Sequence, residues 1–148
     1  MTTLFFSGHS GAGKTSLITA MVPLLLADGV KVGVIKHHHA SLSSGKDSQR
    51  LFAAGVPAAV LAEDGILRMA DAPDLADAIR ALGEEVDLVL VEGLKHAVGP
   101  KILVGEGWSP EIHGVVAWVG TKGHEGAFAL SEVERLYREV VRPMVGQG

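Results

Sequence analysis

The chain has 148 residues, 47% of them hydrophobic and 20% charged, with a formal net charge of −4 and no cysteine. These figures are typical of one globular domain and argue against disorder. The charge disfavours nonspecific binding to nucleic acid or anionic membranes, and the lack of cysteine excludes disulfides, thiolate zinc sites and thiol catalysis. No apolar run matches a membrane span and no signal peptide precedes the first predicted strand. We therefore expect residues 1–148 to form a single soluble, cytoplasmic domain.

A complete phosphate-binding loop stands near the start of the chain. Residues 8–15 read GHSGAGKT, which matches G-x-x-x-x-G-K-[ST], between a predicted strand at 2–7 and a predicted helix at 13–27. The glycines let successive backbone N–H groups turn inward around a phosphate, and the helix N-terminus adds partial positive charge. Lys14 supplies a charge for the β- and γ-phosphates, and the Thr15 hydroxyl can ligate Mg²⁺. The candidate nucleotide-binding residues are Gly8, His9, Ser10, Gly11, Ala12, Gly13, Lys14, Thr15 and Ser16.

The following segments alternate between predicted strands and helices. We expect the first helix to end at Asp28-Gly29 and to be kinked or divided by Pro23. The sequence Glu63-Asp64-Gly65 is a turn signal that predicts a hairpin between the strands on either side of it. The predicted elements are a strand at 30–36, an exposed loop at 37–46, a helix at 47–54, strands at 58–62 and 66–69, and a helix at 74–82.

The second half of the chain begins with a continuous apolar run at 87–91, which is typical of a strand buried on both faces of a parallel sheet. Further strands are predicted at 101–104 and 115–119, and a final helix at 131–141, where Ser131 and Glu134 match a capping box. This alternation predicts an α/β, three-layer P-loop NTPase fold with a mostly parallel sheet flanked by helices. Ligands of such sheets bind at the carboxyl ends of the strands.

Glu92 follows the buried strand at the edge of the sheet where ligands bind. This is the place of a Walker-B carboxylate, which holds Mg²⁺ directly or through water, or orients a water molecule. An ordinary surface glutamate after a strand is the alternative. Because a phosphate-binding loop precedes it in the chain, we assign Glu92 to catalysis and, together with Thr15, to the metal.

A cluster of polar residues ends the strand at 30–36. Lys36 is followed by three adjacent histidines, His37 to His39. Because neighbouring strand residues point to opposite faces, three adjacent imidazoles cannot all face one ion from a regular strand. A metal site, solvated loop histidines and contacts with an anionic ligand remain open, and we favour the anion.

Residues 45–50, which read GKDSQR, place two cations and a hydroxyl around a predicted helix N-terminus, where anions are favoured. Asp47 is either the N-cap of that helix or a carboxylate near magnesium, and we keep it with Glu92 as a catalytic candidate. We expect a second anionic site beside the nucleotide phosphates. Its candidate residues are Lys36, His37, His39, Lys46, Ser48 and Arg50.

The segment at 120–124 reads GTKGH and follows a predicted strand, as a guanine-reading N/T-K-x-D loop would. His124 stands where an aspartate would accept hydrogen bonds from guanine N1 and N2. A glycine-rich connection is the alternative. Thr121 and Lys122 are kept as candidate nucleotide-binding residues.

Several of these motifs occur together and in order over residues 4–104, and they resemble the molybdopterin-guanine dinucleotide biosynthesis protein B family. They are the phosphate-binding loop, VIKHHH at 34–39, GKDSQR at 45–50, DLVLVEGLK at 87–95 and PKI at 100–102. The resemblance implies a homodimeric, GTP-binding adapter of molybdenum-cofactor assembly that uses Mg²⁺ and has weak GTPase activity. In that family the adapter assists the guanylyltransferase that joins GMP to molybdopterin. Molybdopterin is therefore the leading candidate for the second anionic site.

Two other classes of protein share the phosphate-binding loop. A small-molecule kinase would need an acceptor pocket and lid arginines, and a metallochaperone GTPase would use the histidines to deliver a metal. No Gln or Arg in a recognisable position to orient water or to neutralise the transition state can be assigned from the sequence. We therefore expect slow turnover.

Overall fold

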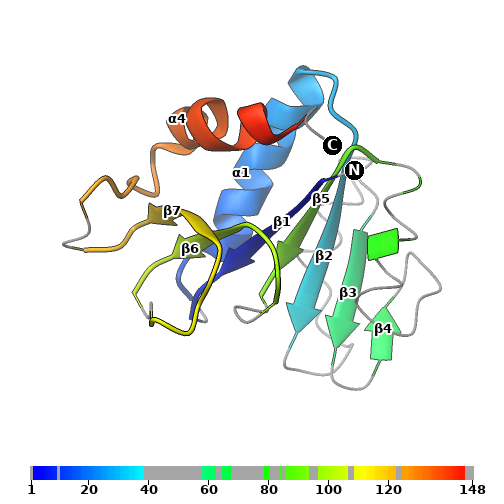
Figure 1. The fold of residues 1–148 in the computed structure, drawn as a ribbon. Helices are drawn as coiled ribbons and strands as arrows, with labels where there is room; N and C mark the ends of the chain where they lie inside the picture. The colour runs from blue at the N-terminus through cyan, green and yellow to red at the C-terminus, as the bar shows by residue number, and fades with distance from the viewer. Residues whose placement is uncertain are drawn as a thin grey trace.

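The computed structural model describes residues 2–9, 11–38, 58–62, 65–67, 79–80, 84, 86–93, 97–106, 109–122 and 125–145, with the backbone alone at 36–38, 58–62 and 65–67. In this part of the chain, seven strands form one sheet in the order β4-β3-β2-β5-β1-β6-β7 (Figure 1). The strands are β1 Thr2–Ser7, β2 Val32–His38, β3 Ala58–Ala62, β4 Gly65–Leu67, β5 Leu88–Glu92, β6 Lys101–Val104 and β7 Val115–Val119. Every neighbouring pair is parallel except β3 and β4, which pair antiparallel. The mostly parallel sheet and the predicted hairpin are confirmed.

Two helical regions lie over the same face of the sheet (Figure 1). Helix α1 spans Lys14–Ala27, and α4 spans Val133–Leu136 and continues as the π-turn η1 Tyr137–Val141 and the 3₁₀ turn η2 Arg142–Met144. The core between helices and sheet includes Leu4, Phe6, Leu17, Met21, Leu25, Val34, Leu90, Ile102, Val119, Leu136 and Tyr137. This packing holds the start of α1 above the carboxyl end of β1, where ligands of parallel sheets bind.

The strands are buried on both faces, as the apolar run at 87–91 predicts. All five residues of β5 are buried. Phe5, Ile35 and Val91 alternate in their strands with residues of the helix-covered core, so they face the other side of the sheet. They are buried too. The predicted helix at 47–54, and that at 74–82 apart from residues 79–80, lie outside the described residues.

Helix α1 ends as predicted, but it is not divided. Asp28 is its C-cap and Gly29 follows with φ 76°. The helix runs through Pro23 as one element, because Pro23 is on the exposed side, where water can satisfy the carbonyl that loses its N–H partner. Of the two outcomes predicted at Pro23, division of the helix is wrong, and a kink stays a prediction.

Strand β2 continues two residues further than its sequence predicts. It pairs in parallel with β3 as far as His38, which stands in register with Ala62. His37 and His38 therefore belong to a strand, and their assignment to an exposed loop is wrong. The ladder with β3 supplies backbone hydrogen bonds that a local pattern of polar residues does not reveal.

The final helix starts later than expected. Its N-cap is Glu132, without a side-chain cap, so the predicted pairing of Ser131 with Glu134 is not its start. Instead, Glu132 Oε1 accepts a hydrogen bond from the Ala129 backbone N–H at 2.8 Å and ties the incoming loop to the helix. In this region, regular α-helix is confined to α4. The predicted helix continues to Val141 with π geometry, and the 3₁₀ turn η2 follows beyond its predicted end.

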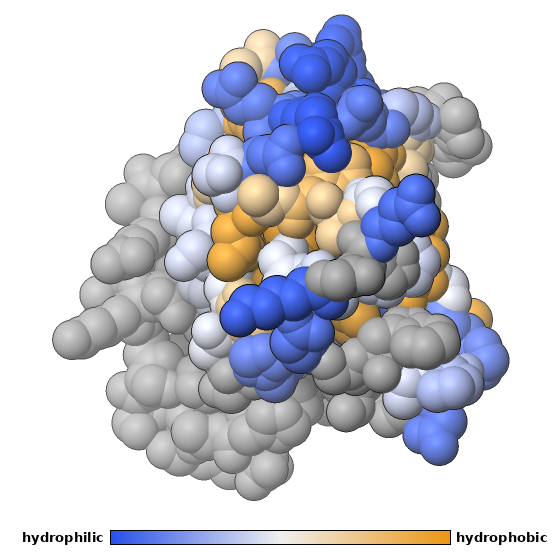
Figure 2. All heavy atoms as spheres, turned by 90° about the vertical axis from the view of Figure 1, so that its left-hand side faces the viewer, coloured by the Kyte–Doolittle hydropathy of each residue, from blue (hydrophilic) through white to orange (hydrophobic). Residues whose placement is uncertain are grey.

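The strand β7 stands at one end of the strand order. Figure 2 views the molecule from the left-hand side of Figure 1 and shows apolar side chains gathered between hydrophilic ones on that face. Val116 and Leu130 are large apolar residues with 45% and 47% of their surface exposed. Among the described residues, no helix is long and apolar enough to cross a membrane.

Candidate functional site

The phosphate-binding loop connects the end of β1 to the start of α1, as the sequence predicts. Ser7 ends the strand and Lys14 begins the helix. A Cβ at Gly8 would lie 2.2 Å from the backbone oxygen of Val104, so only glycine lets the loop pass this close to the end of β6. The loop therefore lies at the carboxyl ends of two neighbouring strands.

Lys14 closes the loop on itself. Its Nζ donates a hydrogen bond to the Gly8 carbonyl oxygen at 2.7 Å, and the Leu17 N–H donates to the Gly13 oxygen at 2.9 Å as the helix starts. An ammonium group has three donors, so it can turn from a carbonyl toward a phosphate that enters the loop. The position is that of a lysine that binds the β- and γ-phosphates.

Thr15 and Glu92 meet at the mouth of the loop. The Thr15 hydroxyl donates to Glu92 Oε1 at 2.5 Å, across 77 residues of sequence. Glu92 is 7% exposed and ends β5, in register with Phe6 of β1. Hydroxyl and carboxylate oxygens are the hard ligands that Mg²⁺ prefers, so the two residues assigned to the metal fit it chemically and lie together.

Ser7 is a supporting residue that the sequence analysis did not single out. Its side chain is fully buried and its hydroxyl donates to the Gly93 oxygen at 3.2 Å, while the Gly93 N–H donates to the Phe6 oxygen at 2.8 Å. These bonds hold the chain after β5 against the end of β1 and so position Glu92. The sequence signal that could have identified it is a small polar residue directly before the first glycine of the loop.

The predicted base-reading loop after β7 lies against the segment that follows β6. The Thr121 hydroxyl donates to the Gly105 oxygen at 2.8 Å, and the Lys122 backbone N–H donates to Glu106 Oε1 at 2.7 Å. Gly105 in turn lies close to the phosphate-binding loop, because a Cβ added to it would lie 2.8 Å from His9 Nε2. The structure therefore joins the two predicted nucleotide-binding loops through residues 104–106, and Glu106 is a polar residue that the sequence analysis missed.

The second anionic site lies largely outside the described residues. These do not include Ser10 of the loop, nor His39, Lys46, Asp47, Ser48 and Arg50. Lys36 and His37 are described by their backbone, which places Lys36 in register with Glu92. Within the described part of the chain, no group of three metal-ligating side chains gathers.

Lys101 is a second lysine with a very different environment. It is 1% exposed at the start of β6, and its Nζ donates to the backbone oxygens of Ala97 at 2.5 Å, Gly99 at 3.2 Å and His113 at 2.8 Å. The ring of Phe5 lies 5.7 Å from the ammonium. Burial lowers the pKa of Lys101 from its ordinary value. This lysine joins two loops and lies at the opposite end of β6 from the phosphate-binding loop.

Comparison with known proteins shows which proteins this chain resembles in sequence and in fold. The family model described as Molybdopterin guanine dinucleotide synthesis protein B matches residues 3–112. The chain is 38% identical over 109 residues to the molybdopterin-guanine dinucleotide biosynthesis adapter protein of Haemophilus influenzae, across 68% of this chain and 61% of that protein. It is 36% identical over 121 residues to the Escherichia coli protein of the same name, across 73% and 69%. The crystal structure of Bacillus subtilis MobB covers 100% of both chains with a TM-score of 0.65 at 22% identity, which is a likeness of fold.

The match to the Haemophilus protein spans about three fifths of that relative's length. The family model includes the phosphate-binding loop, Glu92 and Glu106, whereas Thr121 and Lys122 lie beyond its end. From the extent of this match and from the two sequence identities, the chain belongs to the Molybdopterin guanine dinucleotide synthesis protein B family.

Proposed function

We propose that this protein is a GTP-binding adapter of molybdenum-cofactor biosynthesis, which assists the attachment of GMP to molybdopterin to form the guanine dinucleotide cofactor. Membership of the family supports the pathway, because the Haemophilus and Escherichia relatives are both named as adapters of it. The observation that carries nucleotide binding is the hydrogen bond from Thr15 to Glu92 at the mouth of a complete phosphate-binding loop.

The loop offers what a magnesium-bound triphosphate needs. Lys14 and the first N–H groups of α1 supply positive charge and donors for phosphate oxygens. Thr15 and Glu92 would hold Mg²⁺, which neutralises phosphate charge when it is bound. The Thr15 hydroxyl donates its hydrogen bond to Glu92, so its oxygen lone pairs stay available for the ion.

Catalysis by this site is proposed to be weak. Among the described residues, Glu92 is the carboxylate that would lie beside the phosphates. Asp47 lies outside the described residues and stays a second catalytic candidate from the sequence. The sequence assigns no Gln or Arg to the attacking water or the transition state, and a stabilising Arg alone is worth about 10³ to 10⁵ in rate. We infer that the nucleotide acts on the adapter mainly by being bound, and that its hydrolysis is of minor importance.

The partners follow from the same family. We propose that the protein acts as a homodimer in the cytoplasm, with a molybdopterin guanylyltransferase as its partner enzyme. The second anionic site built from Lys36, His37, His39, Lys46, Ser48 and Arg50 is proposed to receive the phosphate of molybdopterin. The cationic side chains in that set support this, because a phosphate is their natural counter-charge.

The experiment compares the wild type with Glu92→Gln. Calorimetric titration with GTP, in excess Mg²⁺ and in EDTA, should show tighter binding with Mg²⁺ in the wild type, and a loss of about tenfold or more of this enhancement in Glu92→Gln. In a mixture of molybdopterin guanylyltransferase, molybdopterin and GTP, the wild type should increase dinucleotide formation more than Glu92→Gln does.

Glu111→Gln is the matched control, because Glu111 is an exposed carboxylate in the loop before β7. It should behave as the wild type in both assays. A wild-type protein that binds no triphosphate would refute the proposed site. Transfer of the γ-phosphate to a small-molecule acceptor, instead of to water, would identify a kinase.

A further inference from the structure

Guanine recognition needs an acceptor that the loop after β7 lacks in its usual place. The Watson–Crick edge of guanine presents an N1–H and an N2 amino group, which one carboxylate can accept together, whereas adenine presents no such pair of donors. Thr121 and Lys122 fit the pattern of a guanine-reading loop, but the acidic residue of that pattern is replaced by histidine at 124. A GTP-binding protein of this sequence must find its carboxylate elsewhere.

Glu106 brings a carboxylate to this loop from the neighbouring strand. It lies two residues after the end of β6, it is exposed, and its Oε1 accepts the Lys122 backbone N–H at 2.7 Å. A carboxylate has two oxygens with about four lone-pair positions. Within the described residues, Oε2 of Glu106 has no partner, so an oriented acceptor remains open beside the base-reading loop.

The segment that carries Glu106 is anchored to both nucleotide-binding loops. The Gly105 N–H donates to the Val119 oxygen at 2.7 Å, and the Gly105 oxygen accepts the Thr121 hydroxyl. On its other side, a Cβ at Gly105 would lie 2.8 Å from His9 Nε2 and 3.0 Å from Ala12 Cβ. Glu106 is therefore held within the same group of loops that would bind the phosphates.

Leu130 adds an apolar surface beside these loops. Its side chain is 47% exposed, yet it would touch a Cβ at Gly13 at 3.2 Å and one at Gly120 at 3.4 Å. It therefore covers the junction between the phosphate-binding loop and the loop after β7. A planar base can pack on such a surface while its edge meets a polar group.

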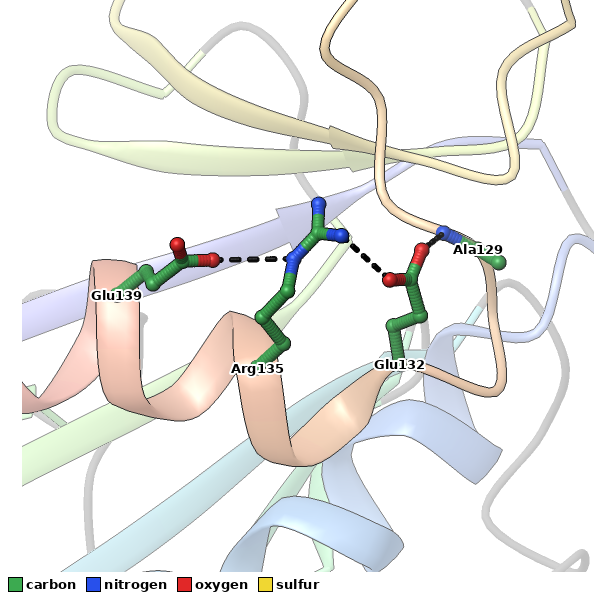
Figure 3. A network of polar contacts seen from close by, with 4 residues as sticks. All are labelled: Ala129, Glu132, Arg135 and Glu139. Atoms are coloured by element: carbon green, nitrogen blue, oxygen red, sulfur yellow. Dashed lines mark hydrogen bonds and ion pairs between the residues drawn. The ribbon is translucent and has the colours of Figure 1, made fainter.

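A polar network fixes the segment before Leu130. Figure 3 shows Arg135 between Glu132 and Glu139, with Glu132 accepting the Ala129 N–H. The Arg135 guanidinium also lies over the ring of Phe128, 4.4 Å from its centroid. Because Ala129 directly precedes Leu130, this network sets the position of the apolar surface.

We propose that Glu106 is the specificity-determining residue for guanine, with its carboxylate accepting hydrogen bonds from the N1–H and N2 amino groups of the base. The base lies against Leu130, and the phosphates extend into the loop at 8–15. Glu106 replaces the aspartate that a guanine-reading loop carries in its own sequence. The assignment rests on the proposed nucleotide function of the phosphate-binding loop.

The test is a change of nucleobase preference in Glu106→Gln. Wild type and variant are titrated by calorimetry with the Mg²⁺ complexes of GTP, ITP, XTP and ATP. The wild type should bind GTP more tightly than ITP, which lacks the 2-amino group. In Glu106→Gln, GTP affinity should fall about tenfold or more and its advantage over ITP should disappear. XTP should gain affinity, because the glutamine amide donates to the xanthine O2 that a carboxylate repels.

Glu111→Gln serves as the control and should keep the wild-type order of nucleotides. An equal loss for all four nucleotides in Glu106→Gln would overturn the proposal, because it would show that Glu106 supports the loops without reading the base. An unchanged preference for GTP in that variant would overturn it as well. If the wild type binds none of the four, the failure lies with the phosphate-binding site itself, and the proposed function falls with it.

Discussion

Lys14 and Lys101 lie at opposite ends of two neighbouring strands: Lys14 begins α1 beyond the end of β1, and Lys101 stands at the start of β6. Lys14 is partly exposed and donates to a carbonyl oxygen of its own glycine-rich loop, an acceptor that a phosphate can replace. Lys101 is buried and its three N–H donors are matched by three backbone oxygens. The difference shows that a lysine serves binding where its donors can be exchanged, and stability where they are saturated.

The largest effect is expected from Lys101→Met. This change keeps the apolar stem but leaves the oxygens of Ala97, Gly99 and His113 without their donor. We expect the free energy of unfolding to fall by about 3 kcal/mol, since each unsatisfied acceptor costs about 1–3 kcal/mol and loop water recovers part of it. Denaturant titration measures the loss. Lys31→Met, at an exposed lysine, is the control, and equal stability of the two variants would show that Lys101 is not a structural centre.

The complementary change is Lys14→Ala. It removes a charge-assisted contact worth about 1.5–3 kcal/mol, so GTP affinity should fall about tenfold or more. The free energy of unfolding should stay within about 1 kcal/mol of the wild type, because the lysine lies at the rim of the fold. Calorimetry and denaturant titration give the two numbers. Unchanged GTP affinity would contradict the assignment of the phosphate-binding loop.

A smaller, pH-dependent effect is expected where Tyr137 joins η1 to the end of α1. Its hydroxyl donates to Asp28 at 2.5 Å, and Arg142 lies 3.7 Å from the same carboxylate. Burial, followed by the hydrogen bond and the charge of Asp28, raises the pKa of Tyr137 from its ordinary value of 10.0 to about 12. A raised pKa stabilises the fold in full below pH 10.0, and this stabilisation is lost as the pH rises through about 12.

Tyr137→Phe should therefore unfold more easily than the wild type by about 1 kcal/mol at neutral pH, with the difference shrinking above pH 10.0. Tyr137 is the chain's only tyrosine, so tyrosinate absorbance reports its ionisation directly. Ionisation of the folded protein at an ordinary tyrosine pKa would contradict the role of the Asp28 contact.

The end of the sheet that carries the phosphate-binding loop was more predictable than the opposite end. The phosphate-binding loop, the helix that follows it and the strand ending in Glu92 are read from contiguous motifs, and the structure has them in place. The contact of Thr15 with Glu92 agrees with their assignment to the metal, and metal binding by these residues stays a prediction. The roles assigned to residues between His39 and Arg50 also stay predictions, because these residues lie outside the described part of the chain.

The predictions that failed concern features whose outcome depends on neighbouring elements. Strand β2 reaches His38 because β3 continues beside it, and Pro23 stays within α1 because it faces solvent. Helix α4 starts one residue later than the capping-box pattern predicts, with Glu132 at its N-cap position and the Glu132 side chain bonded to the incoming loop. In each case a local signal was present, but packing decided which of the possible local structures formed.

The sequence by itself determined the elements whose physical cause is local. Glycines permit the turn of the phosphate-binding loop, and uninterrupted apolar residues specify a strand such as β5 that is buried on both faces. Tertiary structure alone decided which distant groups meet: Thr15 with Glu92, Lys122 with Glu106, and Lys101 with the carbonyls of two loops. The reason is that such contacts depend on strand order and register, which arise from burying the whole core and are not encoded in any short segment.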